Sequence, residues 1–346
     1  MFDRVISWPN LYLAWRRASK GKRSHPNVAA FEHRLEENLC ALHDELAAHL
    51  YRPGNYVNFH IHEPKRRLIS AAPFRDRVVH HALCNIIEPI FEKSFIFDSY
   101  ANRVGKGTHR ALNRCQAFAR RYAFFLQCDL RQYFPGIDHA ILRNVLHKKL
   151  HDPNVIWLID LILASGAGVQ TREYDKTYFE GDDLFAALRP RGLPIGNLTS
   201  QFWANCYLNS FDHFVKRELR CPAYLRFVDD LLFFGNDKRQ LWEWKNKTVE
   251  RLAAFRLTIH AGAQPRPVSE GVPFLGFIVF PQRQRLKPRK AWHFQRRLRK
   301  LMRAYHKQEI PHSKVTGSVQ SWVNHARYGN TVGLRKRMLC RNIRSD

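Results

Sequence analysis

The chain has 346 residues, of which 45% are hydrophobic, so it can form one large folded unit or two to three small ones. Its 57 Lys and Arg outnumber 30 Asp and Glu, and the net charge of +27 indicates a polyanionic partner, most simply nucleic acid. An anionic membrane surface is the alternative, but no apolar run approaches the roughly 20 residues of a membrane span, and the N-terminus lacks the apolar core of a signal peptide. A ribosome-associated protein that is merely basic is disfavoured by the 13% aromatic content.

The cysteines and histidines show no metal-binding spacing. Seven cysteines are scattered without CxxC pairs, and several lie in apolar runs, which predicts buried free thiols in a reducing, cytoplasmic compartment. The 18 histidines form neither HExxH nor a Cys/His ligand pattern, so we expect no zinc site.

The N-terminal part should be helical and then hairpin-like. Residues 28–50 carry apolar side chains at helical spacing, and a Pro-Gly pair ends that helix. Residues 56–70 alternate like two strands that turn at Glu63-Pro64. The turn is either a solvated loop or a cationic finger that reaches for phosphates, because it carries Lys65, Arg66 and Arg67.

A helix is expected over residues 74–95, and a buried strand over residues 122–130 that ends in Asp129. Asp138 then looks like the N-cap of the next helix. The intervening "GKGTHRAL" has only half of a phosphate-loop pattern, so we do not predict an ATPase.

The second half begins with an irregular segment. Residues 165–192 are expected to form a loop and hairpin, in which Asp182-Asp183 make a solvated turn. A Gly/Pro loop and one long helix follow over residues 192–219.

Two adjacent carboxylates then interrupt an apolar run, in "YLRFVDDLLFFG" at residues 224–235. Residues 271–281 predict a strand or hairpin. Ten Lys and Arg lie in residues 283–303 around apolar positions at helical spacing, which indicates a basic amphipathic helix in a small C-terminal subdomain.

Asp129, Asp229 and Asp230 form the constellation that carries chemistry. Each lies on an expected short strand, and two neighbouring strands would bring the three carboxylates together. Buried carboxylates that repel one another need a cation, and oxygen ligands suit Mg²⁺. Two Mg²⁺ ions about 4 Å apart can clamp the attacking and leaving oxygens of a phosphoryl transfer. Mn²⁺ can substitute for them.

The motif "FVDD" resembles the (Y/F)xDD motif of reverse transcriptases. Four other blocks occur in the family's order between residues 57 and 280: "RLISAAPFRDRVV" in the fingers, "CDLRQYF" with the first catalytic Asp, "GLPIGNLTSQFWANCYLN", and "GVPFLGF" at the primer grip. The resemblance implies an RNA-directed DNA polymerase with an α/β right-hand fold: fingers, a palm with an antiparallel sheet, and a small helical thumb. It would bind template RNA, cDNA and dNTPs.

The domain boundaries follow from these blocks. We expect an N-terminal helical extension over 1–50, fingers over 51–125 and 145–192, palm over 126–144 and 193–282, and thumb over 283–346.

One block is more specific. Most reverse transcriptases carry QGxxxSP where this chain has Ile195-Gly196-Asn197-Leu198-Thr199-Ser200-Gln201. The variant IGxxxSQ resembles the reverse transcriptases of diversity-generating retroelements. That resemblance implies adenine-mutagenic cDNA synthesis from a template-repeat RNA, mutagenic retrohoming into a target gene, a pentameric accessory variability protein, and a bacterial or phage origin.

The resemblance also assigns residues by position. Asp129 and Asp229 match the principal metal ligands, with Asp230 in support and Leu130 at the same metal site. The expected dNTP-binding residues are Lys65, Arg66, Arg67, Arg131, Gln132, Tyr133, Phe134, Ile195 and Gly196. Fidelity and template positions are Ile195, Ser200 and Gln201, and the primer grip is Phe274, Leu275 and Gly276. Nucleic-acid contacts on the thumb are expected from Arg289, Lys290, Arg296, Arg297 and Lys300.

Two residues and one missing residue bear on nucleotide selection and proton transfer. Phe134 matches the bulky residue that excludes a ribose 2′-hydroxyl, although a core Phe is the alternative. Ile195 cannot donate the hydrogen bond that Gln makes in most relatives, so nucleotide selection should loosen. The family's general-acid Lys is missing from "RLTIHAGAQPRPV", where His260 or Arg266 could act instead.

Other functions remain open from the sequence. A retron or phage-defence reverse transcriptase shares most of these motifs. A catalytically silent RNA-binding relative would have no reason to keep three costly carboxylates, and a Mg²⁺-dependent nuclease would not need the ordered fingers and loop blocks.

Overall fold

The computed structural model describes residues 1–62 and 66–343, which form a mixed α/β fold with antiparallel sheets. Its central sheet has the strand order β4-β5-β3-β6. The strands span β3 Phe124–Asp129, β4 Tyr224–Phe227, β5 Asp230–Gly235 and β6 Pro265–Pro267. Strands β4 and β5 form a hairpin around "FVDD", where the sequence predicted only a short strand, and β3 pairs antiparallel with β5 along its whole length.

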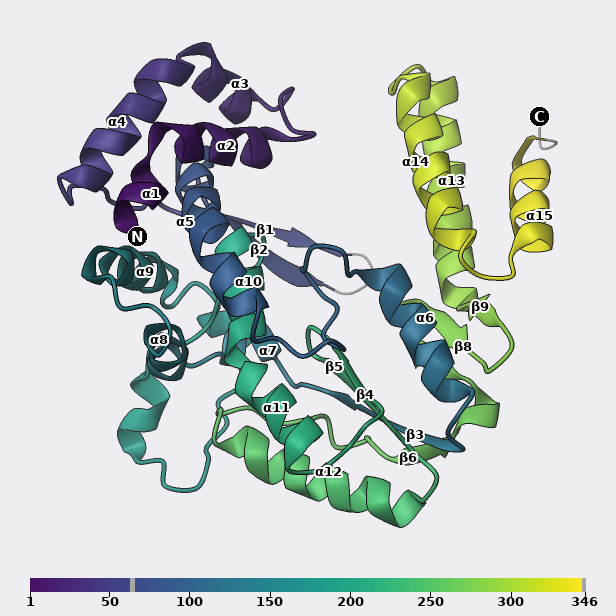
Figure 1. Ribbon diagram of the computed structural model, residues 1–346. Helices are drawn as coiled ribbons and strands as arrows, with labels where there is room; N and C mark the ends of the chain where they lie inside the picture. Colours follow the sequence, from purple (N-terminus) through teal and green to yellow (C-terminus); the bar gives the residue numbers. More distant parts are fainter. Residues whose placement is uncertain (63–65, 344–346) are drawn as a thin grey trace.

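The central sheet separates two hydrophobic clusters. Side chains of a strand point alternately to opposite faces, so Leu126 and Phe233 enter one cluster while Phe125 and Phe234 enter the other. The first cluster is covered by helices, and the second by a helix and the C-terminal part of the chain (Figure 1).

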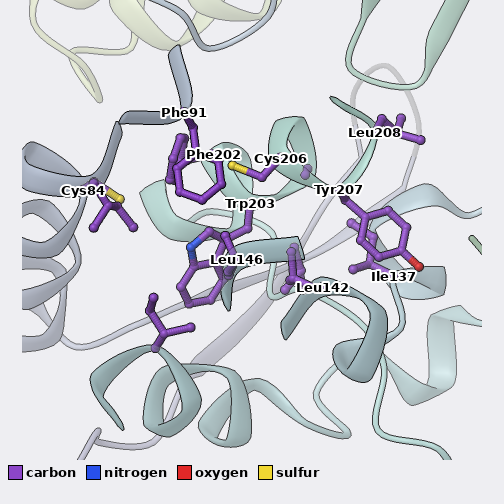
Figure 2. Close-up of a cluster of buried hydrophobic side chains, with 14 of the residues drawn as sticks. Cys84, Phe91, Ile137, Leu142, Leu146, Phe202, Trp203, Cys206, Tyr207 and Leu208 are labelled. Carbon is purple, nitrogen blue, oxygen red and sulfur yellow. The ribbon is translucent and has the colours of Figure 1, made fainter. Parts of the chain in front are cut away.

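The first cluster contains most of the helices. They are α1 Phe2–Ile6, α2 Trp8–Ser19, α3 Pro26–His33, α4 Leu35–Ala47, α5 Phe74–Glu92, α7 Tyr133–Gly136, α8 His139–His147, α9 Pro153–Gly166, α10 Leu198–Tyr207, α11 Asn209–Arg217 and α12 Lys238–Ala253. Figure 2 shows its centre, where Phe91 of α5 meets Phe202 of α10 edge to face at 5.6 Å and Trp203 lies near Leu142 and Leu146.

The second cluster joins the sheet to the C-terminal helices. It contains α6 Thr108–Ala119, the small sheet β7 Val272–Phe274, β8 Phe277–Val279 and β9 Gln284–Leu286, and the helices α13 Pro288–His306, α14 His312–Ala326 and α15 Val332–Ile343. Phe294 of α13 stacks on Trp322 of α14 with ring centroids 4.1 Å apart. The basic amphipathic helix predicted from residue 283 onward is therefore α13.

The hairpin predicted near residues 56–70 is confirmed as β1 Val57–Ile61 paired with β2 Arg67–Ala71. Asp138 caps α8, as predicted, by accepting from the backbone N–H groups of Ala140 and Ile141. Residues 271–281 also form a hairpin, turning at Leu275 and Gly276, both of which have positive φ.

Several sequence predictions were wrong in detail. The helix expected over 28–50 is broken at Arg34, and Leu50 is 66% exposed. The long helix after residue 197 is broken at Leu208 into α10 and α11. No hairpin forms over 165–192, a segment described throughout, which instead holds the short 3-10 helices Thr171–Glu173 and Leu184–Leu188. Asp182 is not in a solvated turn, because its side chain is 3% exposed and pairs with Arg189 and Arg256.

The prediction of buried free thiols is confirmed for five of the cysteines whose side chains are described (Cys84, Cys115, Cys128, Cys206 and Cys221), whereas Cys40 is exposed. None of the helices within 1–62 and 66–343 is long and apolar enough to cross a membrane.

Candidate active site

Two of the three aspartates lie beside each other on adjacent strands of the central sheet. Asp129 ends β3 and Asp230 begins β5, and their Cα atoms are paired partners in the antiparallel register. Paired residues point to the same face, so the two carboxylates lie side by side. Asp229 lies in the two-residue turn before β5, and its carbonyl accepts from the N–H of Leu130 at 3.1 Å. The sheet thus brings together residues 100 positions apart in the chain.

The turn between the strands is strained. Val228 has φ +57°, a left-handed conformation that is rare for a β-branched residue. Its carbonyl accepts a hydrogen bond from Arg226, at 3.2 Å. Arg226 and Asp212 are both 0% exposed and form a double hydrogen bond, which Tyr224 extends with its hydroxyl. This buried ion pair holds the turn from beneath.

The surroundings of Asp230 raise the pKa of its carboxyl group. Burial is the main cause that raises the pKa of Asp230 to about 6, and the charges of Asp229 and Asp129 add to it. Gln127, two residues before Asp129 on the same face of β3, donates to Asp230 at 3.1 Å. Lys287 faces Asp230 and partly offsets the rise.

A cleft of about 730 Å³ contains this acidic pair. It is lined by Arg67 of the β1–β2 hairpin, by Leu275 and Gly276 of the β7–β8 turn, and by Lys287 and Lys290 at the start of α13. The cleft therefore joins carboxylates on one wall to cations on the others, an arrangement suited to a metal-bound phosphate ester.

A family model described as reverse transcriptase (RNA-dependent DNA polymerase) matches residues 61–279, which include the described residues of the cleft other than Lys287, Lys290, Asn324 and His325. The chain belongs to the reverse transcriptase family.

Known relatives match at low identity. The group II intron-encoded protein LtrA of Lactococcus lactis is 25% identical over 213 residues, covering 61% of this chain and 33% of that protein. Protein YkfC of Escherichia coli is 24% identical over 227 residues, covering 64% of this chain and 53% of that protein. A telomerase structure from Candida albicans overlaps with 71% of this chain and 50% of its own at 10% identity and a TM-score of 0.47. The matched region spans a third to a half of the length of these two curated relatives.

The residues predicted for nucleotide binding differ in their placement in this member of the family. Arg67 lines the cleft, whereas Arg66 is exposed and contacts His60 at 3.1 Å. Lys65 lies outside the described residues. Phe134 is half-buried against the first cluster, which is compatible with both a ribose gate and a core position.

The three residues after Leu130 are engaged by protein groups. Arg131 and Gln132 both donate to Asp175, at 3.0 and 3.2 Å, and Tyr133 is buried with its hydroxyl on the carbonyl of Ala204. Tyr133 therefore supports the site from the core and does not form part of its surface.

The loop carrying the IGxxxSQ variant lies against the β1–β2 hairpin. The carbonyl of Ile195 accepts from the N–H of Ser70 at 2.9 Å, and Gly196, at φ +117°, lies under Ile69 of β2. Ser200 is buried, while Gln201 reaches a separate pocket.

The three residues of the predicted primer grip do not all line the cleft. Leu275 and Gly276 line the cleft, but Phe274 is 0% exposed and meets Phe227 edge to face, so it anchors the hairpin in the core. On α13, the five predicted cations are all exposed, and Lys290 also lines the cleft: Arg289, Lys290, Arg296, Arg297 and Lys300.

In the segment where the family's general-acid Lys is missing, one ionisable side chain, that of His260, lies near Asp129. His260 lies with Nε2 4.0 Å from a carboxylate oxygen of Asp129, and its backbone N–H donates to the Asp129 carbonyl at 3.0 Å. Arg266 is paired with Glu270 and lies opposite Phe125, four residues before Asp129.

The carboxylates fit a divalent cation without forming a complete cage. In the part of the chain that is described, no group of three or more His, Cys, Asp or Glu side chains could by itself hold a metal ion. Mg²⁺ usually binds through one or two carboxylates plus waters and substrate phosphates. The neighbouring carboxylates of Asp129 and Asp230 fit this ligand set.

Sequence reasoning missed several residues of the cleft. Gln127 could have been found, because period-two alternation places it on the face of Asp129. The others come from segments far apart in the chain, and no local pattern indicates that these segments meet at the cleft: Thr108, His109, Pro273, Lys287, Asn324 and His325.

Proposed function

We propose that this member of the reverse transcriptase family is an RNA-directed DNA polymerase that uses two divalent cations. The observation that supports this most directly is the cross-strand pair of Asp129 and Asp230, which opens into a cleft with Arg67 and Lys287 on facing walls.

Each part of the cleft has a role in this proposal. By their positions in the family's motifs, Asp129 and Asp229 would be the principal cation ligands, and Asp230, which faces Asp129 and accepts a hydrogen bond from Gln127, would support them. The bound cations would activate the primer 3′-hydroxyl and neutralise the triphosphate. Arg67 binds the triphosphate, and Phe134 excludes the ribose 2′-hydroxyl. The β7–β8 turn positions the primer end, and the exposed cations of α13 follow the template–primer backbone.

We further propose the finer assignment to a diversity-generating retroelement, with an accessory variability protein as partner. It rests on the IGxxxSQ motif. Ile195 is held through its backbone by Ser70, so the loop keeps its place beside β2 while the side chain offers no hydrogen-bond donor to a nucleotide. The likeness to retroelement enzymes carries the preference for template adenines, which the Ile side chain does not explain.

The first test is primer extension on an RNA template with Mg²⁺ and dNTPs, followed by sequencing of the cDNA. Asp229→Asn should lower extension by about a hundredfold or more, because it removes a cation-binding carboxylate. Asp183→Asn, at an exposed aspartate outside the cleft, is the matched control. Equal extension by wild type and Asp229→Asn would refute the polymerase site.

The error spectrum of the same cDNA tests the finer assignment. Errors concentrated opposite template adenines support a diversity-generating retroelement, and evenly spread errors argue for another bacterial reverse transcriptase. If the wild type is inactive, the reaction is repeated with the accessory protein and native RNA, and inactivity there would favour a silent RNA-binding protein.

A further inference from the structure

The segment between α9 and α10 is bonded to the short helix α7, which follows β3 in the chain. The N–H of Leu193 donates to the carbonyl of Phe134 at 2.9 Å. Tyr174 lies against Gly136, where a Cβ atom would be only 3.3 Å from the tyrosine ring. Residues 173–193, called the connecting segment below, therefore contact α7 from both of their ends.

Gln132 is the hinge between the central sheet and α7. The residue before it, Arg131, is fixed in a strand-like manner, because its N–H donates to the carbonyl of Thr258 at 2.8 Å. Gln132 itself occupies the N-cap position of α7 with φ +47° and ψ +47°, which is a left-handed conformation. A residue with a side chain keeps this conformation only where its surroundings hold it.

The connecting segment holds Gln132 through its side-chain amide. The amide N–H groups donate to the carbonyl of Glu173 at 3.0 Å and to the carboxylate of Asp175 at 3.2 Å. The amide oxygen accepts from the backbone N–H of Asp175, also at 3.0 Å. Because both donors of the amide bond the protein, the Gln132 side chain fixes the chain and is not free to bind a nucleotide.

Asp175 contributes more than an ion pair at this hinge. Its side chain is 72% exposed and also accepts from Arg131 at 3.0 Å. An exposed ion pair of this kind contributes little by itself. The reciprocal bonds with Gln132 are directional, however, and they define how α7 leaves the sheet.

Phe134 depends on this hinge for its position. It lies two residues after Gln132, half-buried against the first cluster. Since α7 is a single turn, a rotation at Gln132 moves the whole helix and Phe134 with it. A side chain that selects a substrate by contact has to be held to within about 0.5 Å.

We propose that Asp175 is a positioning residue for sugar selection. By holding Gln132, it fixes Phe134 against the 2′ position of the incoming nucleotide. The inference rests on the proposed polymerase function, with Phe134 as the residue that excludes the ribose 2′-hydroxyl.

The test is equilibrium binding of a dNTP and of the matching rNTP, with Mg²⁺, to the protein on a template–primer whose primer ends in a dideoxynucleotide. No chemistry follows, so the two affinities are read directly. Wild type should prefer the dNTP by about a hundredfold, and Asp175→Ala should lower this ratio to about tenfold, mainly by tightening rNTP binding. Phe134→Ala should abolish the preference. Glu180→Gln, at an exposed acid of the same segment, is the matched control and should keep the wild-type ratio.

A rescue experiment separates positioning from general loosening. Gln132→Glu removes both amide donors and places a second carboxylate beside Asp175, so it should lower the dNTP-to-rNTP ratio as Asp175→Ala does. Adding Asp175→Asn supplies an amide N–H to the new carboxylate and should recover most of the lost ratio. Urea unfolding midpoints confirm that each variant is folded.

The possible outcomes are distinct. Equal ratios in wild type and Asp175→Ala would overturn the inference, as would a Gln132→Glu defect that Asp175→Asn does not relieve. If Asp175→Ala tightens both nucleotides equally, Asp175 instead competes with the triphosphate for Arg131, and the assignment to sugar selection is wrong. A wild type that binds neither nucleotide would refute the polymerase proposal itself, and sugar selection with it.

Discussion

Adjacent residues Asp229 and Asp230 occupy different environments, which explains how the chain tolerates two carboxylates in an apolar run. Asp230 begins a strand and shares a face with Asp129, whereas Asp229 lies in the turn. The next residues of β5, Leu231 and Leu232, then alternate between the two hydrophobic clusters. The charges thus lie at the open end of the sheet, where a cleft reaches them.

The Arg226–Asp212 pair should be essential for stability. Arg226→Met leaves the Asp212 carboxylate buried without its cation, which should lower the free energy of unfolding by about 3–5 kcal/mol. Urea denaturation measures this. The double variant Arg226→Met/Asp212→Leu should recover most of the loss, since it buries no unpaired charge. A single variant within about 1 kcal/mol of wild type would contradict this account.

Ile195→Gln should lower the misincorporation rate, because the restored amide can hydrogen-bond near the incoming nucleotide. The backbone bond from Ser70 to Ile195 does not depend on the side chain, so the loop should keep its position. Sequenced cDNA provides the measurement, with Ile195→Leu as the apolar control. Unchanged error rates in Ile195→Gln would remove Ile195 from the fidelity proposal.

Buried His80 should make the protein acid-sensitive. Its pKa falls from 6.5 to about 3, mainly because of burial, so between these values the unfolded chain binds a proton that the folded chain does not. The free energy of unfolding therefore decreases as the pH falls, by about 2 kcal/mol at pH 5 from this group. His80→Gln should show a flatter pH dependence in urea titrations, whereas exposed His151→Gln should keep the wild-type slope.

At the scale of elements, the strands were predicted better than the helix ends. The alternation of β1–β2 and the apolar run of β3 each specify one geometry, and both are confirmed. The helix breaks at Arg34 and Leu208 were missed because the apolar spacing continues through them. The segment 165–192 was misjudged because Asp182 finds its cations, Arg189 and Arg256, only in the folded chain.

Helix α13 should set the salt dependence of nucleic-acid binding. Replacing Arg296, Arg297 and Lys300 with Ala removes three exposed cations from the face beyond the cleft. If each contacts a duplex phosphate, the slope of log K against log salt should become less negative by about 2–3. Removing Arg217, Arg239 and Lys247 from α11 and α12, on the other side of the sheet, should change the slope far less. Equal slopes for the two triple variants would argue against α13 as the contact surface.

At the scale of the whole molecule, the net charge of +27 includes two basic segments that lie on different parts of the fold. The exposed cations of α13 belong to the C-terminal helices, and the basic stretch at residues 16–23 lies at the end of α2, among the N-terminal helices (Figure 1). The sequence could predict a nucleic-acid partner and an acidic catalytic cluster. It could not predict that Lys287 would face Asp230, since a contact between β5 and the start of α13 depends on how the second cluster packs.

The strand order β4-β5-β3-β6 has a consequence for biosynthesis. β3 lies inside the sheet, yet both of its neighbours, β5 and β6, are encoded after it. Asp230 is synthesised 101 residues after Asp129, which takes about 5–20 s at a translation rate of about 5–20 residues per second. During that interval Phe124, Phe125 and Leu126 have no strand to pair with, so the nascent chain exposes an aggregation-prone apolar segment. We therefore expect slow production of correctly folded protein, relieved by chaperones that bind nascent chains.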